Sequence, residues 1–221
     1  MFFACCLERC HHEVRTWSVI LINKNISKDV WRIIPTHSPN VTALEIKGNF
    51  GKIQIYNMYN DGTHNKTLEN LDNLFTELDS SGNETHANGI LLMGDFNRHH
   101  PMWDEPHNQH LFTAANLHDA QPLLDLLVTY DLIMALPEGI PTLEANGTGN
   151  HTRPDNVFCM SHLQDAIDIC DVTPDLRPTG MDHYPIIMEI SLCPECTNPV
   201  PKEKLPRHKL GKVHEAPNWA A

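Results

Sequence analysis

The sequence predicts an α/β domain built on a mixed β-sheet, and three observations support this class. Apolar and alternating stretches of strand length are interleaved with two stretches of helical periodicity. Neighbouring alternating stretches are joined by glycine-containing turns, which is typical of antiparallel hairpins. One short stretch is apolar along its whole length, as expected of a strand covered on both faces. Parallel and antiparallel neighbours are therefore expected in the same sheet.

The first half of the chain contains four predicted strands and one predicted helix. Residues 18–22 are apolar and rich in β-branched side chains. Residues 41–46 and 52–59 alternate on either side of a glycine-containing turn and predict a hairpin. Four leucines and a phenylalanine at helical spacing predict an amphipathic helix over residues 66–79. Residues 89–94 are the fully apolar stretch and predict a central strand.

The second half begins with a second predicted helix and ends with strands. Helical spacing spans residues 110–130, with a break expected near Pro122. Strands are predicted at residues 132–136, 142–144, 156–159, 166–172 and 184–190. The second and third of these strands are expected to form a hairpin with each other.

Length and composition indicate one globular domain. The chain has 221 residues, enough for one substantial core and too few for two. We divide it into an irregular start at residues 1–16, the domain at 17–192 and a Pro- and Lys-rich tail at 193–221. The net charge of −12 is the wrong sign for binding nucleic acid through a general basic surface. It is compatible with a nuclease that gathers acidic residues around a cation.

Other features bear on the cellular location. No run of about 18 apolar residues is present, so no membrane-spanning helix is expected. Seven cysteines, an odd number, favour a reducing compartment over a disulfide framework. Six Asn-x-Ser/Thr tripeptides would suit a secreted glycoprotein, but the apolar start is interrupted by Glu8 and Arg9 and does not resemble a signal peptide. We therefore expect an intracellular protein, nuclear or cytoplasmic.

The most informative motif directly follows the apolar stretch at residues 89–94. Asp95 and Asn97 lie two residues apart at the expected strand end, so their side chains face the same way. The carboxylate can accept a proton from an attacking water, and the amide can hold that water or a phosphate oxygen. Asp-x-Asn is common in surface turns, but its place after a buried strand favours a site.

Four further residues carry signals that are weaker when each is taken alone. Asp182 and His183 precede the last strand and could supply a metal ligand and an imidazole for an oxyanion. Tyr59 ends a strand, where it either contacts a phosphate or is a half-buried aromatic. Asp155 either orients the His183 ring or is a solvated turn carboxylate.

In their order along the chain, these motifs resemble the endonuclease/exonuclease/phosphatase superfamily. The matching strings are Asn-Met-Tyr-Asn at 57–60, Gly-Asp-Phe-Asn at 94–97, Arg-Pro-Asp at 153–155 and Asp-His at 182–183. The longer strings at 94–103 and 152–158 are similar to LINE-type, non-LTR retrotransposon endonucleases. The resemblance covers about residues 17–191 and implies a four-layer α/β sandwich, in which two packed mixed sheets carry outer helices.

The resemblance also implies roles for the matching residues. Asp95 would activate or align the attacking water, and Asn97 would position the water and the phosphate. His183 would stabilise the transition-state charge while Asp155 orients its ring, and Tyr59 would contact the scissile phosphate. Asp182 would lie on the side of the metal, which in such enzymes is Mg²⁺ or Mn²⁺.

The chain departs from the family pattern at its start. The first matched strand is 18–22, and the family's opening strands, which carry an Asn and a Glu of the metal site, are lacking. The expected function is thus a metal-dependent DNA endonuclease of retrotransposon origin, impaired by the loss of these ligands. The alternative is a catalytically inactive remnant of the same fold. The expected partners are DNA and a reverse transcriptase domain in the parent element, and the expected state is a monomer.

Overall fold

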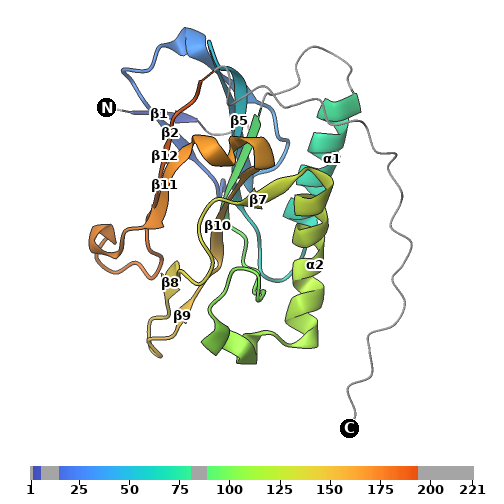
Figure 1. Cartoon of the computed structure of the whole chain (residues 1–221), viewed down its shortest axis with the longest axis vertical. Coiled ribbons are helices and arrows are strands. Elements are labelled where there is room, and N and C mark those ends of the chain that lie inside the picture. The colour runs from blue at the N-terminus through green and yellow to red at the C-terminus, as the bar shows by residue number, and fades with distance from the viewer. Residues whose placement is uncertain (1, 6–14, 81–88, 194–221) are drawn as a thin grey trace.

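A six-stranded mixed sheet forms the centre of the computed structural model, which describes residues 2–5, 15–80 and 89–193 (Figure 1). Its strands are β3 (Trp31–Ile34), β4 (Val41–Gly48), β5 (Gly51–Tyr59), β6 (Gly89–Asp95), β7 (Leu132–Met134) and β10 (Asp155–Met160). They lie in the order β3-β4-β5-β6-β10-β7. The β5–β6 pair is parallel and the other pairs are antiparallel, which confirms the predicted mixed sheet.

Three two-stranded antiparallel ribbons accompany the central sheet. They are β1 (Phe2–Cys5) with β2 (Ile20–Asn23), β8 (Leu143–Glu144) with β9 (His151–Thr152), and β11 (Ile167–Val172) with β12 (Ile186–Ile190). The strand β1 lies within residues 1–16, for which the sequence predicted an irregular start. It pairs along its whole length with β2.

Two α-helices, α1 (Lys66–Ser80) and α2 (Ala114–Thr129), cover one face of the central sheet (Figure 1). The stripe of Leu68, Leu71 and Phe75 on α1 is buried against that face, as its spacing predicted. The predicted break at Pro122 is wrong, because α2 is continuous through it. Leu123 and neighbouring leucines anchor the helix to the core, and this burial offsets the hydrogen bond that proline cannot donate.

The ribbons β1–β2 and β11–β12 lie on the opposite face of the central sheet (Figure 1). Alternate residues of β6 therefore face different layers: Leu92 packs with the helices, whereas Leu91 packs with β11 and β12. This double coverage explains why residues 89–94 are apolar throughout and confirms their central position. Within the described residues, both α-helices lie on one face of this arrangement.

The predicted hairpin between residues 142–144 and 156–159 is wrong. The short strand β8 pairs with β9, while β10 pairs with β6 and β7 in the centre of the sheet. Val157, Phe158 and Cys159 are all buried, so β10 needs covering layers on both faces, which a peripheral hairpin does not provide. The predicted hairpin of β4 and β5 is confirmed, and β11 and β12 lie where the last two strands were predicted.

Gly94 of β6 pairs with Met58 of β5 and lies close to its backbone. Its φ of +133° belongs to a region that L side chains rarely adopt, and a Cβ there would collide with the Met58 carbonyl oxygen. Gly94→Ala is therefore expected to lower the free energy of unfolding by more than about 3 kcal/mol, or to prevent folding. Gly139→Ala is the matched control, because φ is +74° but no atom lies within 4 Å. Urea unfolding should show a cost of only about 1–2 kcal/mol for the control; equal costs would contradict this explanation.

Candidate active site

The candidate site lies at one edge of the central sheet, where β5 and β6 end and β10 begins. In the antiparallel β6–β10 pair, Asp155 lies directly opposite Asp95. In the parallel β5–β6 pair, Tyr59 is the neighbour of Asp95 on the other side. Three residues that are far apart in the sequence are thus placed side by side by strand register alone.

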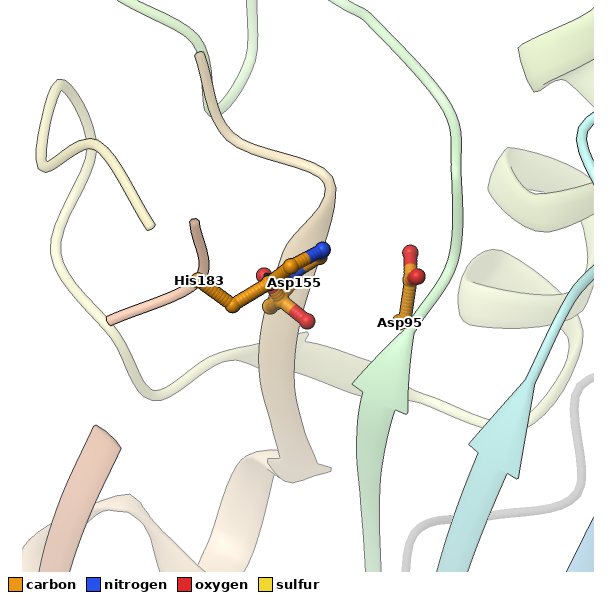
Figure 2. Close-up of side chains that lie close together, drawn as sticks. All are labelled: Asp95, Asp155 and His183. Atoms are coloured by element: carbon orange, nitrogen blue, oxygen red, sulfur yellow. Dashed lines mark hydrogen bonds and ion pairs between the residues drawn. The ribbon is translucent and has the colours of Figure 1, made fainter. Parts of the chain in front are cut away.

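His183 joins these residues from the segment that leads into β12. Its Nδ1 lies 2.8 Å from Oδ2 of Asp155, within hydrogen-bonding distance. One potential ligand atom from each of Asp95, Asp155 and His183 falls within 4.8 Å of the others. Figure 2 shows the three side chains converging from the ends of β6 and β10 and from the His183 segment. The structure therefore brings three of the six predicted site residues into one cluster.

Two other predicted residues border this cluster. Asn97 has a φ of 48°, a left-handed conformation that asparagine tolerates, and its backbone N–H donates to Asp95 Oδ1 at 3.0 Å. Its side-chain amide donates to the Asn60 carbonyl at 2.9 Å. The Tyr59 ring stacks on Trp17 with centroids 5.6 Å apart. Both residues are neighbours of Asp95. Asn97 contacts it through its backbone N–H, and Tyr59 lies beside it through the pairing of β5 with β6.

The sixth predicted residue, Asp182, lies beside the cluster and contributes charge to it. Its negative charge helps to raise the pKa of His183, but its carboxylate is not among the three groups that converge. Its backbone carbonyl accepts a hydrogen bond from the Glu144 N–H at 2.9 Å.

The β8 strand fixes the backbone around His183. Leu143 forms a β-bridge with His183, and the Tyr184 N–H donates to the Thr142 carbonyl at 2.7 Å. The Thr142 hydroxyl also accepts a hydrogen bond from the Asp155 N–H at 3.1 Å. Both partners of the His183–Asp155 hydrogen bond are therefore held by β8 and by Thr142, the residue directly before it.

A side-chain cluster reinforces this arrangement. The Glu144 carboxylate accepts hydrogen bonds from the Tyr184 hydroxyl at 3.0 Å and from the Arg177 guanidinium at 2.6 Å. The same guanidinium lies over the Tyr184 ring, 4.8 Å from its centroid. The sequence analysis missed these residues, because they interact only after β8 and the His183 segment meet.

Arg153 supports the segments that carry the site, and the sequence singled it out only as part of the Arg-Pro-Asp motif at 153–155. Its side chain is fully buried and donates to the carbonyl oxygens of Leu136 at 2.8 Å, Trp103 at 3.2 Å and Pro137. It also donates to Asn156 Oδ1 at 2.9 Å. Burial lowers the pKa of Arg153 to about 10, so the group stays charged at neutral pH. It ties the segment after β6 to the start of β10.

The environment shifts the pKa values of two cluster residues. Burial, together with the charge of Asp155, raises the pKa of Asp95 to about 6. The hydrogen bond that the His183 ring donates to the Asp155 carboxylate is the main cause that raises the pKa of His183 to about 9. At neutral pH the cluster therefore presents an imidazolium beside carboxylates, which suits stabilisation of a developing oxyanion. A carboxylate with a pKa close to neutral suits a general base.

The donor set also fits a divalent cation. The carboxylate oxygens of Asp95 and Asp155 are the hard ligands that Mg²⁺ and Mn²⁺ prefer, and both ions commonly retain several waters. His183 is less suited as a ligand, because its ring is held as an imidazolium by Asp155.

Carboxylates and a histidine gathered at the strand ends of a mixed α/β fold are groups that hydrolysis of a phosphodiester can use. Residues 53–187 match the family described as endonuclease-reverse transcriptase. Since the match spans more than half of the chain, the protein belongs to this family, within the endonuclease/exonuclease/phosphatase superfamily. The comparison with curated proteins found no match.

Solved structures of nucleases share the fold. The endonuclease domain of TRAS1, a telomere-specific non-LTR retrotransposon, has a TM-score of 0.59 at 18% identity over 78% of this chain and 72% of that domain. The AP endonuclease LMAP from Leishmania major has a TM-score of 0.62 at 14% identity, over 78% of this chain and 65% of its own. The 3′ phosphatase NExo from Neisseria, bound to a product DNA hairpin, has a TM-score of 0.50 at 17% identity, over 73% and 70%. At such identities the likeness concerns the fold.

None of the helices in the described part of the chain is long and apolar enough to cross a membrane.

Replacing the Asp95 carboxylate should stabilise the metal-free protein. Its pKa of about 6 in the fold lies above the value of about 3.9 in the unfolded chain, so the folded state loses stability as the pH rises from 4 to 6. Asp95→Asn should therefore raise the free energy of unfolding at pH 7 by about 1–2 kcal/mol, allowing for partial solvent screening. Little gain should remain at pH 4, where Asp95 is protonated.

This comparison is made by urea unfolding in EDTA. The exposed Asp165→Asn is the control and should change stability by less than about 0.5 kcal/mol at either pH. Destabilisation by Asp95→Asn at pH 7 would show that the fold does not disfavour the ionised form of the Asp95 carboxylate.

Proposed function

We propose that the protein hydrolyses phosphodiester bonds in DNA and that the reaction requires Mg²⁺ or Mn²⁺. The observation that supports it best is the convergence of Asp95, Asp155 and His183 at one edge of the sheet. Membership of a nuclease family and the fold shared with three DNA-processing enzymes support DNA as the substrate.

Each residue of the cluster has a distinct task in this reaction. Asp95 aligns the attacking water and accepts its proton. Asn97, held by the Asn60 carbonyl, positions the water and the phosphate. Asp155 binds His183 Nδ1, which leaves the Nε2–H to face the charge that develops on a phosphate oxygen. Tyr59, beside Asp95, contacts the scissile phosphate.

The cation would be held by the carboxylates of Asp95 and Asp155, with Asp182 on the same acidic side. When bound, it neutralises the phosphate and the leaving oxygen. The described cluster offers few anionic ligands, and one of its three members is an imidazolium at neutral pH. We therefore expect weak cation binding and slow turnover by this chain.

The small number of anionic ligands in the described cluster also supports one alternative function. In this alternative, the protein is a member of the family that does not catalyse the reaction. In that case the fold and its nucleic-acid contacts persist while the cation is bound too weakly for catalysis. The proposal further includes a retrotransposon origin, a reverse transcriptase domain in the parent element, an intracellular place of action and a monomeric endonuclease domain.

Plasmid nicking in a Mg²⁺ and Mn²⁺ series tests the proposal. Slow nicking should rise through the millimolar range and should stop in EDTA. Asp95→Asn and His183→Gln should each lower the rate at least about 100-fold, because they remove the base and the oxyanion partner. His118→Gln, an exposed substitution on α2, is the matched control and should leave the rate unchanged.

Two outcomes would decide against the active enzyme. Nicking that persists in both Asp95→Asn and His183→Gln would assign the activity to a contaminant or to another site. Absence of nicking by the folded wild-type chain at all cation concentrations would favour the family member without turnover.

A further inference from the structure

An exposed tryptophan lies beside the candidate active site. Trp17 is 58% exposed and is the most exposed residue among the Trp, Tyr and Phe of the described part of the chain. Its indole stacks on the Tyr59 ring, with centroids 5.6 Å apart and ring planes inclined by 23°. Tyr59 is in turn the strand neighbour of Asp95. An exposed aromatic ring is thus attached to the residue proposed to contact the scissile phosphate.

The backbone around Trp17 is held in place although its side chain is exposed. The Trp17 N–H donates to the Pro39 carbonyl at 2.9 Å, and the Tyr59 N–H donates to the carbonyl of the residue after Pro39, also at 2.9 Å. Ser18, which follows Trp17, is buried, and its hydroxyl donates to the Asn57 carbonyl at 2.7 Å. The same two-residue segment therefore fixes the backbone of both stacked residues.

This arrangement sets Trp17 apart from the other exposed apolar residues nearby. Val19 and Leu21 alternate with it along the segment and are 50% and 59% exposed. Of the three, Trp17 has the aromatic ring, and that ring lies on a residue of the candidate site. A ring that is held in position before its ligand arrives loses less conformational entropy on binding. The exposed indole is therefore suited to a flat ligand at this site.

Electrostatic attraction gives the candidate site little help in holding a DNA strand. Residues 59–193 contain 21 acidic and four basic residues, and two of the four, Arg98 and Arg153, are buried. Contacts of lysine and arginine with phosphates usually supply much of the affinity for DNA. Stacking of a base on an aromatic ring needs no positive charge, and every base has a π-face that can stack.

We propose that Trp17 is a stacking platform for an unpaired nucleobase of the DNA strand, close to the scissile phosphate. The inference rests on the proposed function, because Tyr59 connects the indole to the phosphate site. One strand spacing of about 4.8 Å separates Tyr59 from Asp95, and the indole lies on the Tyr59 ring. The base would therefore stack beside the cluster of Asp95, Asp155 and His183 and leave the cluster free for the phosphate.

Binding of a fluorescein-labelled oligothymidylate to the full chain, measured by fluorescence anisotropy in EDTA, tests the proposal. Trp17→Ala should raise the Kd at least about fivefold, because the contact with a stacked base is lost. Trp17→Phe keeps an aromatic face and should recover most of the affinity. Leu21→Ala is the matched control, because it removes an equally exposed apolar side chain from the same segment. It should leave the Kd within about twofold of the wild-type value.

An abasic oligonucleotide of the same length separates stacking from other effects. The wild-type chain should bind it at least about fivefold more weakly than oligothymidylate, and Trp17→Ala should change this Kd by less than about twofold. The salt dependence of oligothymidylate binding should be equal in the wild type and in Trp17→Ala, since the lost contact releases no counterion.

Three results would overturn the proposal. They are equal affinities of the wild type and Trp17→Ala for oligothymidylate, equal losses in Trp17→Ala and Leu21→Ala, and absence of binding by the wild type. An equal loss of abasic-strand binding in Trp17→Ala would also overturn it, since the substitution would then act through the general structure. The assay involves no cleavage. Plasmid nicking by the wild type together with unchanged binding by Trp17→Ala would refute the stacking alone, whereas Trp17-dependent binding without nicking would count only against the proposed hydrolysis.

Discussion

The antiparallel pairing of β10 with β6, in the register that sets Asp155 opposite Asp95, is the constraint on which the candidate active site depends. A shift by one residue would turn Asp155 to the helix-covered face and put the polar Asn156 in its place. Burial of Val157 and Phe158 on opposite faces of the sheet opposes such a shift. Gly94 permits the same register on the other side, because only a residue without Cβ lets β6 approach the Met58 carbonyl.

This register places two carboxylates closer together than stability alone would favour. The shared burial and the charge of Asp155 raise the pKa of Asp95, and His183 offsets part of this repulsion by its hydrogen bond to Asp155. The surrounding structure holds the pair in place: β8 binds the backbone on both sides of His183, and Arg153 ties the segment after β6 to the start of β10. Such strain is common where carboxylates serve chemistry rather than folding.

Local patterns in the sequence predicted the elements that depend on local spacing. The leucine stripe of α1, the β4–β5 hairpin and the apolar β6 were each found in this way, and Asp95 was identified because it ends β6. The partner of β10 could not be found, because its pairing with β6 joins residues about 60 positions apart and leaves no periodic signal. Local patterns also failed at Pro122 and at β1. Tertiary contacts decide whether α2 continues through Pro122 and whether residues 2–5 pair with β2. The convergence of His183 with Asp95 was expected from the order of the family motifs and not from periodicity.

The most direct test of the β6–β10 register and its consequence is the titration of the His183 imidazole by NMR, in the wild-type chain and in Asp155→Asn. The structure predicts a pKa of about 9 in the wild type, because Asp155 hydrogen-bonds Nδ1 and adds its charge. In the variant the pKa should fall to near or below the ordinary value of about 6.5, since burial then dominates. A wild-type pKa close to 6.5 that Asp155→Asn leaves unchanged would show that the two residues do not meet, and would contradict the site described above.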